Sequence, residues 1–365
     1  MLIAGLEARS FRSLSAFEAK LGPGITTILG PNGAGKTNLL EAVFFALTGR
    51  SFRTGDRREL IAFGEPVARA AVTLAGEDGA EHILLASISR GEGRRHLLDG
   101  AVTAPADSAR LRPHLTVFSP DLLALVKGPP GERRAHLDAF IAVRWPARAD
   151  LRRSYGQALA QRNALLGRVA AGLAGKPELD AWDATLSATA EALIAARRAA
   201  IAELAAPFAR AAADLGLADD AELGYAPRAD GTAEAIADEL RSRRERELQS
   251  GRTTYGPHLD EVSLKRAGRP LRRYGSQGEQ RAALLALLFA EREALLEAAA
   301  TPPLMLLDDV MSELDPEHRE LLVSRLEGQG QSLITAADED AVPASARNGA
   351  IRLAGAAGNP LSAVA

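Results

Sequence analysis

One glycine-rich segment near the start of the chain has the spacing of a phosphate-binding loop, G-x-x-x-x-G-K-T. Glycines let backbone N–H groups approach phosphate oxygens, the lysine can reach the β- and γ-phosphates of a nucleotide, and the threonine hydroxyl can bind Mg²⁺. A glycine-rich turn that precedes a lysine by chance is the alternative interpretation. We assign nucleotide binding to these residues: Gly30, Pro31, Asn32, Gly33, Ala34, Gly35, Lys36, Thr37 and Asn38.

The segments on both sides of this loop support the assignment. Residues 25–29 are apolar and β-branched and predict a buried strand, whereas residues 38–47 are good helix formers throughout. A strand, a glycine loop and a helix in this order direct a helix N-terminus at phosphate oxygens. The context therefore favours a nucleotide site, with Lys36 as a catalytic residue and Thr37 as a metal ligand.

A pair of acidic residues ends a second apolar segment. Residues 304–307 predict a buried strand, and Asp308 and Asp309 follow it directly. In P-loop proteins an acid at the end of such a strand lies beside Mg²⁺. We therefore expect Asp308 to contact the metal and Asp309 to orient or deprotonate an attacking water. An acidic turn after a core strand is the alternative.

Two helix-start signals lie near this strand. Ser276 and Glu279, three residues apart before a long apolar helix, form the pattern of a capping box. A capped helix N-terminus is also what an anion needs, so a nucleotide role is compatible with the cap. Asp315 before Pro316 is the second signal.

The composition limits the class of protein. With 47% hydrophobic and 25% charged residues among 365, the chain has the composition of a soluble globular protein. It has no cysteine, which excludes disulfides and thiolate chemistry. A net charge of −3 means that any nucleic-acid contact must come from local arginine patches. No segment is apolar enough for a transmembrane helix, and Glu7 and Arg9 interrupt the apolar run that a signal peptide needs.

The hydrophobic pattern of the sequence changes twice along the chain. Residues 67–117 alternate as strands do, and residues 147–249 follow helical spacing, with a possible short strand near residues 223–225. Pro146, Pro177 and Pro207 predict breaks between helices of ordinary length, which excludes a long coiled coil. Strand texture returns at residues 256–274, before the Ser276 helix.

At this point the chain resembles a known group of proteins. The S-x-G-x-Q segment formed by Ser276, Gln277, Gly278, Glu279 and Gln280 is similar to the signature of ABC ATPases, and residues 311–316 are similar to their D-loop. The long insertion between loop and signature resembles the SMC-like branch, and within it the RecF family. The RecF-like stretches are residues 10–12, 49–53, 118–122, 128–138, 256–258, 276–280 and 306–315.

The resemblance implies a fold and a division into domains. It implies an α/β fold: an ABC-type P-loop ATPase head, made of a β-rich N-terminal lobe and a RecA-like core, with an inserted helical lobe. We expect the head at residues 1–127 and 255–365 and the helical arm at residues 128–254.

The resemblance also implies a site shared by two chains. ATP and Mg²⁺ would bind to the loop of one chain and be completed by the signature and D-loop of another, in an ATP-dependent homodimer. It adds three residues to the nucleotide contacts expected above: Arg12, Asp315 and Thr335. Thr335 stands where these ATPases usually carry a histidine that senses the γ-phosphate.

The functional implications go further. The family resemblance implies a cytoplasmic, nucleoid-associated ATPase, weak and stimulated by DNA, that acts in recombinational repair, replication and the SOS response. Its implied partners are single-stranded, gapped and double-stranded DNA, RecR and RecO, and indirectly RecA, with no membrane. Arginine forks suit phosphates, so the candidate DNA contacts are Arg50, Arg53, Arg57, Arg58, Arg133 and Arg134, unless nearby acids pair with them.

Several departures and alternatives remain. No glutamine stands in residues 117–120 to sense the metal, Leu259 replaces the usual arginine after Gly-Pro-His, and His136 replaces an aromatic residue. An ABC transporter domain would need a shorter insertion, and a nuclease-linked SMC-like ATPase would need coiled coils or a further acidic domain. Another SMC-like ATPase that serves as a structural DNA clamp stays open.

Overall fold

The structure is a computed structural model that describes residues 1–365 except 77, 92, 106, 218–219, 299–302, 354–360 and 363–365. Spatial contacts divide the chain into two units, residues 1–122 with 295–365, and residues 123–294. The second unit contains the helical segment expected from the sequence together with residues 255–294. The assignment of residues 1–127 and 255–365 to the ATPase head and of residues 128–254 to the helical arm remains a proposal.

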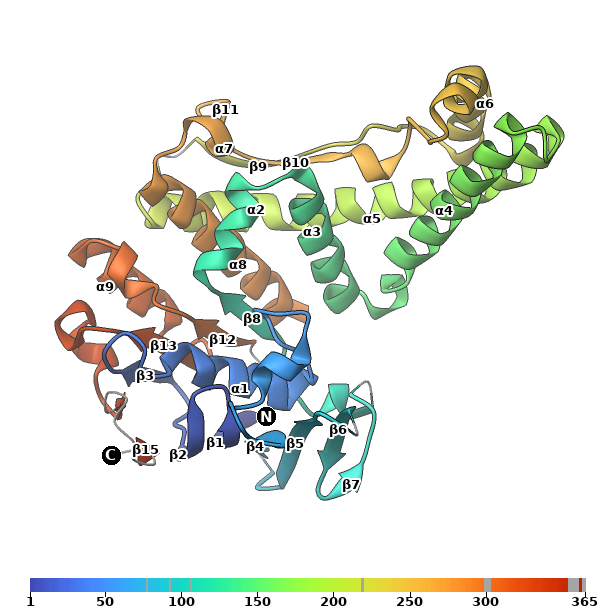
Figure 1. Ribbon diagram of the computed structural model, residues 1–365. Coiled ribbons are helices and arrows are strands. Elements are labelled where there is room, and N and C mark those ends of the chain that lie inside the picture. Colours follow the sequence, from blue (N-terminus) through green and yellow to red (C-terminus); the bar gives the residue numbers. More distant parts are fainter. Residues whose placement is uncertain are drawn as a thin grey trace. The chain divides into compact units, whose positions relative to one another are not determined.

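Within the described residues, seven strands of the first unit form one sheet (Figure 1). Neighbouring strands in this sheet are antiparallel, except that β15 is parallel to β2. The order is β15 (Leu361–Ser362), β2 (Leu14–Lys20), β1 (Leu2–Phe11), β4 (Val67–Ala75), β5 (Glu81–Ser89), β6 (Gly93–Leu98) and β7 (Ala101–Val102). This is the β-rich lobe that residues 67–117 predicted.

A second, parallel sheet of five described strands carries the candidate site at its edge. The order is β14 (Ile351–Arg352), β3 (Ile25–Leu29), β13 (Ser332–Ala336), β12 (Leu304–Leu307) and β8 (Leu115–Phe118). Every residue of β12 and β13 is buried, so these two strands are covered on both faces, which explains why β12 is a continuous apolar run.

Helix α1 (Lys36–Thr48) packs against strands of both sheets and joins them into one core. Leu39, Leu40, Val43, Phe45 and Leu47 are all inaccessible to solvent. A helix that is apolar on every side must be covered on every side, and this position provides that cover. The other helices of the unit are α9 (Pro316–Leu326) and the 3₁₀ turns η1 (Arg57–Leu60), η2 (Asp107–Arg110), η3 (Pro120–Leu123), η7 (Met311–Glu313), η8 (Glu339–Ala341) and η9 (Ala344–Ala346).

The second unit is built on helices. Helices α4 (Leu151–Ala170), α5 (Leu179–Asp214) and α6 (Ala233–Ser250) pack against one another, and β9 lies along α5 (Figure 1). In the described part of this unit, β9 (Ala221–Ala226), β10 (Glu261–Arg266) and β11 (Arg269–Pro270) form an antiparallel sheet. The remaining elements are α2 (Ala124–Lys127), α3 (Pro130–Arg144), η4 (Pro146–Arg148), η5 (Lys176–Glu178), η6 (Pro257–Leu259), α7 (Leu271–Tyr274) and α8 (Gln277–Ala298).

One expected helix break does not occur. Helix α5 runs for 36 residues through Pro207, so the prediction of a break there was wrong. Proline removes one helical hydrogen bond and costs about 3 kcal/mol. Leu204, Phe208 and Ala211 around it are at most 1% exposed, and their burial offsets that cost. The short strand expected near residues 223–225 is confirmed as β9.

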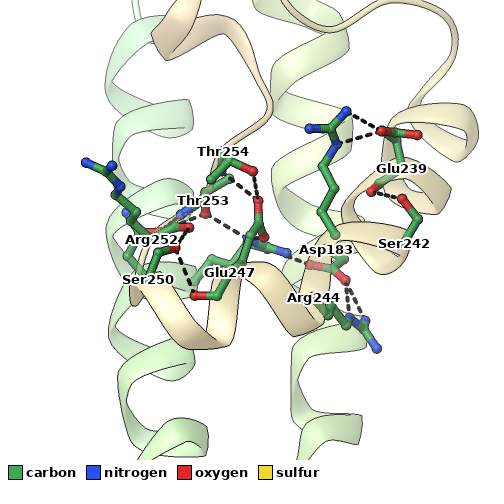
Figure 2. A network of polar contacts seen from close by, with 12 residues as sticks. Asp183, Glu239, Ser242, Arg244, Glu247, Ser250, Arg252, Thr253 and Thr254 are labelled. Atoms are coloured by element: carbon green, nitrogen blue, oxygen red, sulfur yellow. Dashed lines mark hydrogen bonds and ion pairs between the residues drawn. The ribbon is translucent and has the colours of Figure 1, made fainter.

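Buried charges join the three long helices. Arg162 of α4 pairs with Asp183 of α5 and Glu247 of α6, and all three side chains are fully buried. Figure 2 shows Asp183, Glu247 and Thr253 meeting in this network. Among the described residues, no helix is both long and apolar enough to cross a membrane.

Candidate nucleotide site

Three neighbouring parallel strands place the site residues at one edge of the second sheet. The glycine loop follows β3, Thr335 lies near the end of β13, and Asp308 follows β12. The strand register sets Ile28 beside Thr335 and Leu307 beside Ile334. Carboxyl ends of adjacent parallel strands meet at the same edge, so segments 270 residues apart in the chain converge.

The loop has the backbone that a phosphate cradle needs. Gly33 and Gly35 have φ values of 84° and 94°, in the left-handed region that favours glycine. Gly30 serves another purpose, because a Cβ there would lie 2.9 Å from the carbonyl oxygen of Leu353. Helix α1 begins at Lys36, so its N-terminal N–H groups open into the loop.

The Lys36 side chain lies folded over this loop. Its Nζ donates to the carbonyl oxygens of Gly30 at 2.6 Å and Pro31 at 3.0 Å. Burial lowers the pKa of Lys36, and the negative charges of Asp309 and Asp308 oppose that shift. The ammonium group is therefore held at the mouth of the loop by carbonyls that a phosphate can replace.

Asp308 connects the loop to the neighbouring strands. Both of its carboxylate oxygens lie 2.9 Å from Thr37 Oγ1, and Thr335 Oγ1 donates to its Oδ1 at 2.8 Å. Burial raises the pKa of Asp308, while the hydrogen bonds from Thr335 and Thr37 lower it. A hydroxyl and a carboxylate in contact are the oxygen ligands that Mg²⁺ takes from a protein when phosphates and waters supply the rest.

Asp309 is held in an unusual backbone conformation. Its φ is 50°, and its N–H donates to Thr335 Oγ1 at 2.8 Å. Its Oδ1 is buried without a hydrogen-bond partner. A buried carboxylate oxygen with no partner is costly, and a water or ligand at the site would satisfy it. Among the described residues, no group of three His, Asp or Glu could hold a metal by itself.

These residues line one open pocket of about 300 Å³. Arg53, which the sequence analysis placed with the DNA-contacting arginines, is part of its wall. Arg53 Nη1 lies 3.0 Å from Asn38 Oδ1 and 3.4 Å from Glu41 Oε2. The pocket lining is Asn32, Gly33, Gly35, Lys36, Thr37, Asn38, Arg53, Asp308 and Asp309.

Glu41 is the residue that sequence reasoning missed. Its carboxylate is fully buried and accepts two hydrogen bonds of 2.9 Å from Arg12 and one of 2.5 Å from Ser51. It thereby positions both Arg12 and Arg53. Because Arg12 is 29 residues away in the chain, no local pattern signals this pairing. Arg12 lies outside the pocket lining, and its nucleotide role stays a prediction.

The capping box at the signature segment is confirmed. Ser276 Oγ accepts from the N–H of Glu279 at 3.2 Å, and the Glu279 carboxylate accepts from the N–H of Ser276 at 2.6 Å. The backbone hydrogen bond from Ser276 lowers the pKa of Glu279. Ser276, Gln277 and Gly278 are exposed, whereas the buried Gln280 donates to the carbonyl of Leu271. This segment belongs to the second unit and the loop to the first.

The second helix-start signal is confirmed as well. Asp315 caps α9, and its Oδ1 accepts from the N–H of His318 at 3.0 Å. Its D-loop role remains a prediction. In the region without a metal-sensing glutamine, Phe118 ends β8 beside Leu307, and its carbonyl accepts from the N–H of Asp308.

The remaining arginine candidates differ in their surroundings. Arg50 and Arg57 are exposed, and no carboxylate of the described residues pairs with either. Arg58 pairs with Asp56 at 2.9 Å. In the second unit, Arg133 is 5% exposed and pairs with Glu261, and Arg134 donates to the carbonyl of Asp260. Of the six, Arg50 and Arg57 are the most available to an external phosphate.

Comparison with known proteins agrees with this geometry. Residues 2–355 match the family model of the RecF/RecN/SMC N terminal domain. The chain is 38% identical to the DNA replication and repair protein RecF of Anaeromyxobacter dehalogenans (strain 2CP-C) over 93% of each chain, and 36% identical to that of Myxococcus xanthus (strain DK1622) over 95% of this chain and 93% of the relative.

Solved structures confirm the expected fold. The structure of the recombination mediator protein RecF with ATP, of the RecFOR pathway, has a TM-score of 0.80, with 27% identity over 94% of this chain and 93% of that one. An Smc head bound to the C-winged helix domain of ScpA shares the fold, with a TM-score of 0.60 and 17% identity over 96% and 94%. The chain therefore belongs to the RecF family of the RecF/RecN/SMC N-terminal domain proteins.

Proposed function

We propose that the chain is an ATP-dependent DNA-binding ATPase of replication and recombinational repair. The observation that carries this proposal is the 2.9 Å contact between Thr37 of the loop and Asp308 after β12. It joins a phosphate cradle to a metal-binding carboxylate within one pocket that Lys36 also lines. The names of its RecF relatives support the role in DNA, and the ATP of the solved RecF supports the nucleotide.

The pocket residues have separate roles in the proposed hydrolysis. Thr37 Oγ1 and Asp308 would hold Mg²⁺, which when bound neutralises charge on the phosphates. Lys36 would leave the carbonyls of Gly30 and Pro31 for the β- and γ-phosphates. Asp309 would accept a hydrogen bond, and then a proton, from the attacking water through its unpartnered Oδ1. Arg53 would add positive charge from the pocket wall.

The proposed active form is a dimer of this chain. The loop of one protomer and the Ser276 helix of its partner would enclose the nucleotide, because the capped N-terminus of α8 supplies N–H groups to an anion. Asp315 of the partner would approach the same seam. Each half alone leaves the γ-phosphate incompletely bound, so the dimer would close only with ATP and open after hydrolysis.

The proposed biological setting follows the RecF relatives. The dimer would bind gapped, single-stranded and double-stranded DNA in the cytoplasm and, with RecR and RecO, help to load RecA during the SOS response. Arg50 and Arg57 are the arginines whose exposure best supports phosphate contact. A structural DNA clamp that only binds ATP is the second candidate, favoured if the wild type does not hydrolyse ATP.

One experiment tests the proposal. Fluorescence anisotropy of a labelled gapped duplex is measured with wild type and Asp309→Asn, with and without ATP and Mg²⁺, at about 50 and 200 mM salt, because phosphate contacts give a steep salt dependence. We expect DNA binding to require ATP and the affinity to fall about tenfold or more between the two salt concentrations. The Asp309→Asn protein should stay bound to the DNA for longer than the wild type. Equal affinity with and without ATP contradicts the proposal. In a parallel assay, absence of phosphate release by both proteins favours the structural clamp, whereas equal turnover by both excludes Asp309 as the water-orienting residue.

A further inference from the structure

A second pocket of about 300 Å³ lies within the second unit. Residues of the β10–β11 hairpin and of α7, elements that Figure 1 labels, form much of its wall. This volume is at the lower end of those that hold small ligands. Its wall combines apolar residues with several cationic ones. The lining is Val126, Arg133, Ala226, Glu261, Ser263, Leu264, Lys265, Pro270, Arg272 and Arg273.

The strand register determines which charges face the pocket. Four residues of β10 line the pocket: Glu261, Ser263, Leu264 and Lys265. Arg266 is absent from the lining and pairs with Glu279. Lys265 and not Arg266 is therefore the cation that β10 contributes to the pocket.

The hairpin turn fixes this register. Lys265 pairs with Pro270 and Arg266 with Arg269, which leaves Ala267 and Gly268 as a two-residue loop. Their φ values of 50° and 69° are those of a turn whose twist matches antiparallel strands. Alanine at a positive φ is strained, so the surrounding structure must hold the turn in place.

The pocket carries an excess of positive charge. Its one carboxylate, Glu261, is neutralised by Arg133 at 2.7 Å. Arg133 spends its other donors on the carbonyls of Val262, Gly128 and Leu125, so it offers little to a ligand. Lys265, Arg272 and Arg273 then remain, and no carboxylate of the described residues pairs with any of them.

We infer that this pocket binds a phosphate of the nucleic acid, an inference that rests on the DNA-binding function proposed above. A concave site with three cations suits a phosphate better than a flat surface would, because each arginine fork can bind two oxygens of the phosphate. The apolar wall of Val126, Leu264 and Pro270 suits the adjoining sugar or base. Tyr274, 63% exposed directly after Arg273, offers a ring on which a base can stack.

The phosphate could belong to the end of a strand or to its interior, and both carry the chemistry that this pocket recognises. A terminal phosphate has up to two negative charges, whereas an internal one has a single charge. Three cations therefore favour the terminal group if it can enter. Oligonucleotides that carry a 5′-phosphate, carry a 5′-hydroxyl or are circular distinguish binding of a terminal phosphate from binding of an internal one.

The test compares the full chain with a Lys265→Ala/Arg272→Ala/Arg273→Ala variant, with ATP and Mg²⁺ present. Anisotropy of labelled single-stranded DNA is followed over a salt series. We expect the variant to lose affinity about tenfold at 0.1 M salt and to lower the slope of log K against log salt by about two, since each single-strand contact contributes about 0.7. A greater loss with the 5′-phosphate probe assigns the pocket to strand ends.

Arg269→Ala is the matched control, because Arg269 is exposed on the same hairpin but does not line the pocket. It should keep the wild-type slope. ATP-dependent dimer mass should be equal in all three proteins, which shows that each variant is folded. If the triple variant keeps the wild-type affinity and slope, the pocket does not bind a phosphate of DNA, and the proposed function is unaffected. If the wild type does not bind DNA at all, the proposed function is contradicted as well.

Discussion

Asp308 holds its charge in a place that disfavours it. Its side chain is 6% exposed, and burial raises its pKa above the usual aspartate value. A raised pKa in the folded state means that the ionised carboxylate costs stability at neutral pH, and that this cost disappears as the pH falls below the unfolded value. The site therefore stores negative charge that Mg²⁺ would neutralise, a compromise typical of functional sites.

Asp308→Asn should separate stability from activity. At pH 7 the free energy of unfolding of the nucleotide-free protein should rise, with a smaller gain near pH 4, because the amide carries no charge to bury. ATP hydrolysis should fall at least about 100-fold. Denaturant unfolding at the two pH values and phosphate release measure this. Lower stability at pH 7 with normal hydrolysis would exclude Asp308 from the metal site.

At the residue scale, the sequence predicted what lies in short motifs. The glycine loop and Asp308 each follow an apolar strand, and local spacing alone indicated their roles. Arg53 and Glu41 could not be found in that way, because the carboxylate that positions Arg53 also binds Arg12, 29 residues from Glu41. Such a pairing depends on the packing of α1 against the rest of the unit, and a local sequence pattern does not predict that packing.

The three-helix arm contains a network of buried charges in addition to its apolar core. Arg162 Nε lies 2.6 Å from Asp183, and its Nη1 lies 2.6 Å from Glu247 and 2.8 Å from Thr253 (Figure 2). Each of the three long helices contributes at least one charged member, and α6 adds Arg244, which pairs with Asp183. Removing Arg162 would leave the buried Glu247 with its hydrogen bonds from Thr254 but without its cation, while Asp183 keeps Arg244.

Arg162→Ala should therefore destabilise the arm by about 3–5 kcal/mol. The matched control is Lys176→Ala, since Lys176 pairs with Glu245 at the surface of the same unit, and an exposed pair contributes about 1 kcal/mol or less. Amide hydrogen exchange in α4, α5 and α6 measures both. Similar protection factors in the two variants would show that the buried network does not stabilise the arm.

At the element scale, helix starts were easier to predict than helix ends. The capping box at Ser276 and the cap at Asp315 are local patterns, and both are confirmed. Pro207 was expected to end a helix, yet α5 continues because its neighbours are buried against other elements. Tertiary burial overrides local preference at that position, and a single sequence does not reveal it.

At the scale of the whole molecule, the fold class was predictable and the extent of each unit was not. The order of loop, long insertion, signature and acidic strand indicated an ABC-type head with an inserted helical lobe, which the RecF structures confirm. The sequence could not show that β9 pairs with β10, residues 221–226 with 261–266. That pairing joins the strand segment before Ser276 to the unit of the long helices.

We propose that two copies of this chain close around ATP. Light scattering of wild type with ATP and Mg²⁺ should give twice the mass of the 38.5 kDa chain, and the single-chain mass without nucleotide. Lys36→Ala should stay monomeric because the loop no longer holds the phosphates, and Ser276→Arg should bind nucleotide as a monomer. A wild type that keeps one mass in both conditions, or a Lys36→Ala protein that dimerises normally with ATP, would contradict a dimer that closes around the nucleotide.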